Sequence, residues 1–262
     1  MKYFAASLLS AALAWGTENH HAVLVAGSSG YWNYRHQADI AHAYQIMIKN
    51  GIPADNIVVM MYDDVANNRS NPFPGQLFNH PDGENVYDAS AIDYSGRDVT
   101  PEKFLAVLKG DAQTAGGKVL NTDKNSKVFI NFADHGAPGF VCFPSANLYA
   151  DDLQDTIDYM QANNLYDEMT IYIEACESGS MFDLIKPEQK IYAVTASNAD
   201  KSSYAAYCGT DAVVDGHMIG SCLSDLFTQN WILDVIENEG ITAKIPASSS
   251  CWLCAVMPAF HS

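Results

Sequence analysis

Short apolar segments alternate with amphipathic ones along this chain, and this alternation constrains the fold more than any other feature. The apolar segments span residues 22–26, 57–62, 128–133, 169–175 and 191–195. Helical spacing or cap signals predict helices over residues 36–50, 100–109 and 151–163. Near-continuous apolar strands joined by helices are typical of a parallel sheet covered on both faces. The sequence therefore predicts an α/β fold, a three-layer α/β/α sandwich with a mainly parallel sheet.

The first predicted helix has the clearest pattern. Its apolar side chains on one face are Ile40, Ala43, Tyr44, Met47 and Ile48. Gly51 follows at the C′ position, where helices commonly end. Residues 63–94 are rich in Asn, Pro and Gly, so we expect a long surface excursion there.

Two of the predicted strands end in residues that can carry chemistry. Cys176 follows the strand over residues 169–175 and precedes a Ser/Gly turn, and His135 follows the strand over residues 128–133. A lone cysteine is more often a buried structural thiol, and a lone histidine a hydrogen-bonded core residue. Side chains at the carboxyl ends of neighbouring strands, however, meet over the sheet edge, where α/β sites lie. The spacing therefore favours a thiol and imidazole pair at one site.

The charge balance excludes some partners. The chain has 14 Lys and Arg residues against 31 Asp and Glu residues, a formal charge of −17. Because no basic patch is present to bind phosphate backbones, nucleic acid is not an expected partner. Crowded carboxylates have raised pKa values in a folded chain, so we expect a higher melting temperature near pH 5 than near pH 7.5.

Residues 1–14 read as a secretory signal peptide, with Lys2 before an apolar run and a small-residue cleavage site. No segment reaches the roughly 20 apolar residues of a transmembrane helix, so we expect no stable membrane anchor. Asn68 begins a glycosylation sequon. Cys251 and Cys254 form an isolated C-x-x-C without a second pair, so we predict no metal site and no cofactor. The pairing of the remaining cysteines stays open.

Several motifs resemble the legumain family, in the family's order, over residues 19–231. They include GSSGYWNYRHQAD at 27–39, NGIP at 50–53, MMYDD at 60–64, NP at 71–72, DHG at 134–136 and EACESGS at 174–180. Legumains are asparaginyl endopeptidases of caspase-like fold. The resemblance therefore implies a cysteine endopeptidase that cleaves after Asn, and after Asp at low pH, through a thioester. It also implies peptide substrates, cystatin-like inhibitors, and passage to a lysosome, a vacuole or the extracellular space.

The resemblance also implies roles for the residues at the strand ends. Cys176 matches the nucleophile and His135 the acid/base, while Asn33 matches a third catalytic position that supports the histidine. The backbone N–H groups of Gly136 and Cys176 match the donors to the oxyanion. Asp134 matches a position that can form a succinimide.

Five further residues match the family's pocket for the residue before the scissile bond. They are Arg35, His36, Glu174, Ser202 and Asp225. The first two can donate hydrogen bonds, the two carboxylates can accept, and the hydroxyl can do either. Such a set suits a side-chain amide and discriminates strongly, because a substrate without the amide leaves buried polar groups unpaired.

The match fades after Trp231, and Ser224 stands where the family usually has glycine. We therefore predict a peptidase domain over residues 15–238 and a divergent tail over 239–262 without a recognisable prodomain. Three alternatives stay open. The chain could be an inactive, truncated legumain-like protein, a peptide ligase that uses the same thioester, or a glycolipid-anchor transamidase with the same Cys/His pair.

Overall fold

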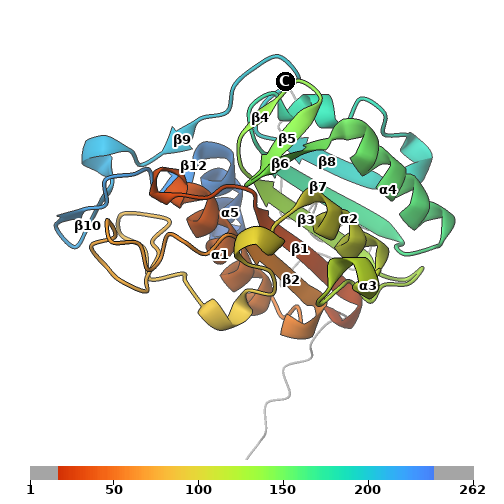
Figure 1. Cartoon of the computed structure of the whole chain (residues 1–262), viewed down its shortest axis with the longest axis horizontal. Coiled ribbons are helices and arrows are strands. Elements are labelled where there is room, and N and C mark those ends of the chain that lie inside the picture. Colours follow the sequence, from red (N-terminus) through yellow and green to blue (C-terminus); the bar gives the residue numbers. More distant parts are fainter. Residues whose placement is uncertain (1–16, 239–262) are drawn as a thin grey trace, which may run out of the picture.

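The computed structural model describes residues 17–238 and builds them around a five-stranded parallel sheet with the order β2-β1-β3-β7-β8 (Figure 1). The strands are β1 (His20–Ala26), β2 (Ile57–Met61), β3 (Lys127–Ala133), β7 (Glu168–Glu174) and β8 (Ile191–Thr195). All five predicted strands are confirmed within two residues at each end. The predicted signal peptide, the divergent tail, Cys251 and Cys254 lie outside the described residues. Within residues 17–238, no helix is long and apolar enough to cross a membrane.

Helices cover both faces of the sheet (Figure 1). Helices α1 (Tyr34–Lys49) and α5 (Leu226–Asn238) lie on one face, and α2 (Pro101–Lys109), α3 (Ala112–Ala115) and α4 (Ala150–Ala162) lie on the other. Successive side chains of a strand point to opposite faces. Accordingly Leu24 of β1 packs in the core beneath α1 and α5, while Val23 and Val25 pack in the core beneath α2 and α4. The three-layer α/β/α prediction is therefore confirmed.

Smaller elements lie at the carboxyl edge of the sheet. They are β4 (Gly136–Ala137), β5 (Phe140–Phe143), β6 (Ala146–Tyr149), β9 (Ala205–Ala206), β10 (Val213–Val214), β11 (His217–Met218) and β12 (Ser224–Asp225). Strands β4, β5 and β6 form one small sheet, β9 pairs with β12, and β10 pairs with β11. A disulfide between Cys208 and Cys222 closes the loop that carries β10 and β11. The loop that returns to β12 is thus covalently fixed.

Short 3-10 helices mark several connections. Their bounds are Thr17–Asn19, Tyr31–Asn33, Ala54–Asn56, Ala89–Ala91, Gly96–Asp98, Ser178–Met181, Pro187–Gln189 and Gly209–Asp211. The second of these leads directly into α1, so α1 begins at Tyr34, two residues before the predicted start. Met47 is buried as expected, but Ile48 is 36% exposed. Gly51 follows the helix with φ at 85°, a left-handed conformation that costs glycine little.

Residues 63–94 form no strand or α-helix and are mostly exposed or partly exposed, as a surface excursion predicts, but several side chains in this segment are buried. Leu77 and Phe78 are buried against the core under α1, and Tyr94 forms an isolated bridge with Met60. Asn71 is also buried, and its amide donates to the carbonyl oxygens of Ala66 (2.8 Å) and Gln76 (2.9 Å). The Asn-rich composition therefore reflects side chains that satisfy a turning backbone inside the fold.

Candidate active site

The two residues predicted to share a site follow neighbouring strands. Strands β3 and β7 pair in parallel, with Ala133 opposite Glu174 at the last position. The chain after β3 stays close to the chain after β7, because a Cβ added to Gly136 would lie 2.5 Å from the carbonyl oxygen of Cys176. No side chain fits at that distance, so glycine is required next to His135. His135 and Cys176 thus leave the sheet at the same edge.

A sharp turn follows the cysteine. Glu177 adopts a left-handed conformation with φ at 51°, and its N–H donates to the carbonyl oxygen of Lys201 at 2.7 Å. A non-glycine residue in this conformation is uncommon and often marks a functional turn. Cys176 remains partly exposed, and its Sγ atom lies 3.6 Å from the Oγ atom of Ser203. The turn therefore presents the thiol at the surface of the site.

Asn33 orients the imidazole of His135. The Nε2 atom of His135 lies 2.9 Å from Oδ1 of Asn33, and the Nδ2 atom of Asn33 donates to the carbonyl oxygen of Ser29 at 2.9 Å. That second bond fixes which end of the amide faces the ring. Because an amide oxygen only accepts, the proton lies on Nε2 and the lone pair on Nδ1. Burial, followed by the charge of Arg35, lowers the pKa of His135.

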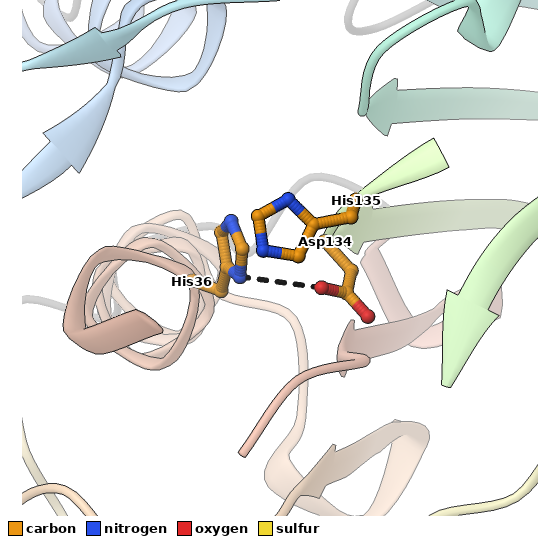
Figure 2. A group of neighbouring side chains, drawn as sticks. All are labelled: His36, Asp134 and His135. Atoms are coloured by element: carbon orange, nitrogen blue, oxygen red, sulfur yellow. Dashed lines mark ion pairs between the residues drawn. The ribbon is translucent and has the colours of Figure 1, made fainter. Parts of the chain in front are cut away.

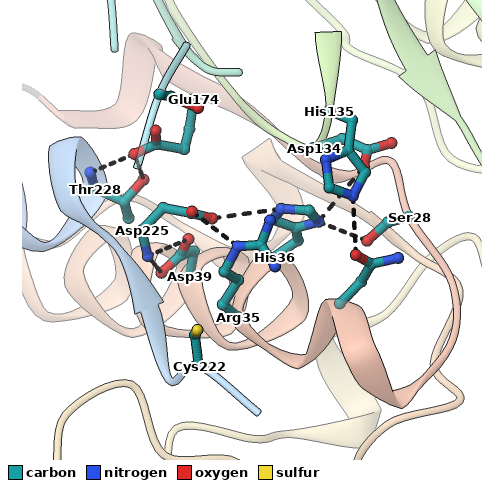
Figure 3. Close-up of polar contacts among 12 residues, drawn as sticks. Ser28, Arg35, His36, Asp39, Asp134, His135, Glu174, Cys222, Asp225 and Thr228 are labelled. Atoms are coloured by element: carbon teal, nitrogen blue, oxygen red, sulfur yellow. Dashed lines mark hydrogen bonds and ion pairs between the residues drawn. The ribbon is translucent and has the colours of Figure 1, made fainter. Parts of the chain in front are cut away.

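An arginine and a histidine from the first turn of α1 face one aspartate (Figure 3). The Nε atom of Arg35 donates to Oδ1 of Asp225 at 2.8 Å, and Nε2 of His36 lies 3.4 Å from Oδ2 of the same carboxylate. On its other side, Nδ1 of His36 lies 2.7 Å from Oγ of Ser28 and 3.5 Å from Oδ1 of Asp134. Because His36 is fully buried, its pKa is well below the usual value, and Arg35 and His135 lower it further.

Carboxylates outnumber cations in this buried region. Burial, then Asp225, raises the pKa of Glu174 to about 8, although Thr228 donates to it from its N–H (2.8 Å) and its hydroxyl (3.1 Å). Burial also raises the pKa of Asp134 to about 8. For Asp225, burial raises the pKa more than Arg35 lowers it. Among the described residues, Oε1 of Glu174 and Oδ1 of Asp134 have no hydrogen-bond partner. Such atoms are available to a bound ligand.

Asp39 supports the pocket from one turn further along α1. Its Oδ1 atom accepts from Oγ of Ser224 (2.8 Å) and Nδ2 of Asn79 (2.7 Å), and its Oδ2 atom accepts from the N–H of Asp225 (3.2 Å). Burial, then the charge of Asp225, raises the pKa of Asp39. This carboxyl group fixes the backbone of β12 and with it the position of Asp225.

The structure brings most of the predicted site residues together. Ser202 is exposed and directly precedes Ser203, whose hydroxyl contacts the thiol. Asn68, the predicted glycosylation site, is partly exposed and donates to the carbonyl oxygen of Asp64 at 3.2 Å. Sequence reasoning missed four polar partners, which are Ser28, Asp39, Ser203 and Thr228. Only Asp39 had a usable signal, because its four-residue spacing from Arg35 places both on one face of a helix.

The arrangement combines a nucleophile, a base and a polar pocket. A free thiol and an oriented neutral imidazole lie at one sheet edge, and α1 and β12 supply buried donors and acceptors beside them. His36, Asp134 and His135 also offer possible metal ligand atoms that all lie within 4.8 Å of one another (Figure 2). The structure thus places a buried polar cluster with unpaired carboxyl oxygens at the sheet edge where the thiol and the imidazole lie.

Comparisons with known proteins give a consistent family. Residues 20–245 match the model of the peptidase C13 family. A hemoglobinase of Schistosoma mansoni is 50% identical over 217 residues, covering 82% of this chain and 49% of that protein. Legumain of Mus musculus is 49% identical over 219 residues, covering 82% of this chain and 49% of that protein. The vacuolar-processing enzyme beta-isozyme of Arabidopsis thaliana is 49% identical over 225 residues, covering 84% and 46%.

The chain thus spans about half the length of these relatives. Among solved structures, caspase-1 from Spodoptera frugiperda superposes with a TM-score of 0.46 at 10% identity, covering 84% of this chain and 71% of that chain. That likeness is too distant to support an argument about the site.

Proposed function

Because the chain belongs to the peptidase C13 family, the family of its legumain relatives, we propose that it is a cysteine endopeptidase that hydrolyses peptide bonds after asparagine. One observation carries this proposal. His135, held by Asn33 at 2.9 Å, leaves the sheet beside Cys176 at the ends of two paired strands. A thiol next to an oriented neutral base is the arrangement that nucleophilic catalysis requires.

In the proposed reaction, the Cys176 sulfur attacks the carbonyl carbon of the peptide bond. The tautomer fixed by Asn33 leaves Nδ1 of His135 free to take the thiol proton and to pass it to the leaving amine. The C–N bond breaks and a thioester remains on Cys176. Water, deprotonated by the same imidazole, then cleaves the thioester and releases the acid. Backbone N–H groups of Gly136 and Cys176 are the proposed donors to the oxyanion.

The pocket formed by Arg35, His36, Glu174 and Asp225 supports the proposed preference for asparagine. Arg35 and His36 supply donors for an amide oxygen, and the unpaired Oε1 atom of Glu174 is an acceptor for an amide N–H. Ser202 is proposed to line the exposed side of this pocket. A substrate aspartate would face Glu174 and Asp225, so it should be accepted only when protonated at low pH.

A place in the secretory pathway fits the chain's own disulfide. The bond between Cys208 and Cys222 forms in oxidising compartments. One relative is named as a vacuolar-processing enzyme. We place this chain in an acidic lysosomal or vacuolar compartment, where the raised pKa values of Glu174 and Asp134 keep these carboxyl groups protonated.

The test is cleavage of an asparagine reporter peptide at about pH 5.5 by the purified chain and by two cysteine variants. We expect Cys176→Ala to abolish cleavage. Cys142→Ala removes the other free thiol of the described residues and should leave cleavage unchanged. A reporter with glutamine in place of asparagine should be cleaved much more slowly. Cleavage that persists in Cys176→Ala, or that is lost equally in both variants, would overturn the proposal.

A further inference from the structure

We propose that His36, Asp134 and His135 form a binding site for a divalent zinc ion, and that zinc held there inhibits the chain. The three side chains come from the first turn of α1 and from the two residues that follow β3. One ligand atom from each lies within 4.8 Å of the other two (Figure 2). Two imidazole nitrogens and one carboxylate oxygen are a ligand set that zinc commonly takes in proteins. The sequence alone predicted no metal site, and His36 lies far along the chain from the adjacent Asp134 and His135.

The distance between the first two ligands suits zinc. Nδ1 of His36 lies 3.5 Å from Oδ1 of Asp134. With bonds of about 2.0–2.1 Å, two ligand atoms of a tetrahedral zinc ion are about 3.3–3.4 Å apart. Both side chains are buried, at 1% and 4% exposure, and therefore hold their positions. His135 is exposed and lies edge-on to His36, with 5.1 Å between ring centroids, so a small movement of its ring completes the set.

A second observation points to a missing ligand between these groups. Oδ1 of Asp134 is buried and has no hydrogen-bond partner among the described residues, although Nδ1 of His36 lies 3.5 Å from it (Figure 2). A buried carboxylate oxygen without a partner is costly, and each case in a folded protein requires an explanation. A cation bound between Oδ1 and the two imidazoles would satisfy this atom. The charge of Arg35 acts on Asp134 as well as on Glu174 and Asp225, but its hydrogen bond goes to Asp225.

In both histidines, the ring nitrogen that would not bind the metal has the kind of partner that metal-binding histidines usually have. A ligating histidine usually donates its other ring N–H to a carboxylate or a carbonyl group. Nε2 of His36 faces Oδ2 of Asp225 at 3.4 Å, and in the tautomer that carries its proton on Nε2 the lone pair is on Nδ1, the atom nearest Asp134. Ser28 shares that lone pair at 2.7 Å, and its hydroxyl would rotate away when zinc binds. Asn33 lies at 2.9 Å from the ring of His135.

The site has a route for entry and a fourth position for solvent, because His135 is on the exposed side of the cluster. The inhibitory consequence rests on the proposed function, in which His135 is the acid/base and His36 lies in the substrate pocket. Zinc bound to the His135 ring occupies a nitrogen lone pair that proton transfer requires. It also blocks the pocket, so inhibition should weaken as the concentration of an asparagine peptide rises.

Binding is tested first, without any need for activity. The full chain carrying Cys142→Ala, Cys176→Ala, Cys251→Ala and Cys254→Ala has no cysteine outside the Cys208–Cys222 disulfide, so Co²⁺ as a spectroscopic probe and Zn²⁺ by calorimetry report on nitrogen and oxygen ligands. At about pH 8 we expect one equivalent to bind. Adding Asp134→Asn or His135→Ala should weaken binding more than about tenfold, the smallest loss typical of even an outer-shell partner. His217→Ala, an exposed histidine elsewhere, is the matched control and should not change binding.

The outcomes separate the site from the proposed function. Equal binding by the His135→Ala and His217→Ala variants, or no binding by their parent, would overturn the site. His135→Ala decides this even if Asp134→Asn unfolds, because His135 is exposed and melting curves can confirm its fold. For the chain with its own thiols, Zn²⁺ should inhibit reporter cleavage measured in the same pH 8 buffer as binding, and a chelator should restore it. Binding with unchanged cleavage would overturn the inhibitory role alone, whereas binding to a chain that never cleaves would contradict the proposed function and leave the site in place.

Discussion

Strands β3 and β7 have charged residues at both ends of the ladder they share, and the two ends have opposite effects on the stability of the fold. At the first position Lys127 lies opposite Glu168, and their side chains form an ion pair of 2.5 Å in which both are partly exposed. At the last position Ala133 lies opposite Glu174, which is buried. The charge with the largest effect on the pKa of Glu174 is that of Asp225. At the amino end the carboxylate has a cationic partner and access to solvent. At the carboxyl end the carboxyl groups are buried and outnumber the cations beside them.

This difference shows which end serves a ligand. An exposed ion pair contributes little to stability, and its loss is easily tolerated. Buried carboxyl groups without cations instead reduce stability, so the fold retains them only with compensation from hydrogen bonds and protonation. Arg35 is the one arginine that contacts this group of carboxylates in the described part of the chain. A bound donor or cation would therefore stabilise the carboxyl end, whereas the charged groups at the amino end already have their partners.

Removing the cation at each end should give the largest contrast. Arg35→Ala leaves Asp225 buried without its partner at 2.8 Å, and we expect it to lower the free energy of unfolding by about 3–5 kcal/mol. Lys127→Ala at the amino end should cost at most about 1 kcal/mol, because the pair with Glu168 is partly solvated. Urea unfolding of both variants at one pH measures the two values. Equal losses would show that burial does not separate the two ends.

The second largest contrast expected is in how each end contributes to the dependence of stability on pH. The pKa of Glu174 is raised to about 8, so this group is protonated in the folded chain and ionised in the unfolded chain between about pH 5 and pH 8. The unfolded chain then binds fewer protons, and stability falls as pH rises toward 8. Glu174→Gln should remove up to about 1.4 kcal/mol of this loss per pH unit. Urea unfolding of the parent chain and of Glu174→Gln across this range measures the difference.

The window for this comparison lies between about pH 6.5 and pH 8. Burial lowers the pKa of His36 and of His135, so protonation of these groups destabilises the folded chain below their unfolded value of about 6.5. Below that value the histidines oppose the carboxyl groups, while above it only the carboxyl groups titrate. Melting temperatures of the parent chain should therefore fall from pH 6.5 to pH 8. A parent chain whose melting temperature rises over this range would contradict the raised pKa values.

The sequence was sufficient to predict the frame of the molecule and the positions of Cys176 and His135 at one edge of its sheet. Apolar runs and helical spacing have a local physical cause, and the strands that end before His135 and Cys176 were placed correctly. The glycine after His135, in contrast, is required by the close approach of a distant backbone, that of Cys176. Helix α5 was not predicted, because its first residues follow the irregular loop that the disulfide closes.

The buried partners could not be predicted, because their contacts join distant parts of the chain. Asn79 and Ser224 meet at Asp39 across separations of 40 and 185 residues, and neither has a local pattern that marks it as buried. Composition even suggested the opposite for the segment that contains Asn79. Polar residues that satisfy one another inside a fold look like surface residues in a sequence, and only the fold distinguishes them.

The smallest expected effect tests one of these unpredicted contacts. Ser224→Ala removes a buried hydroxyl that donates to Asp39 at 2.8 Å, and Ser90→Ala removes an exposed hydroxyl that donates to Asp88 at 2.7 Å. Burial raises the pKa of Asp39, so at a pH below that raised value the lost bond is to a neutral carboxyl group and should cost about 1 kcal/mol, a few degrees in melting temperature. As pH rises and Asp39 ionises, the loss should grow toward about 2 kcal/mol, since hydrogen bonds to charged groups are stronger. The Ser90 variant should show no such growth, because solvent replaces its hydroxyl at every pH.

A Ser224 effect that stays constant with pH would mean that Asp39 keeps one charge state throughout. The contrast between the two ends of the ladder would then rest on Glu174 and Asp134 alone.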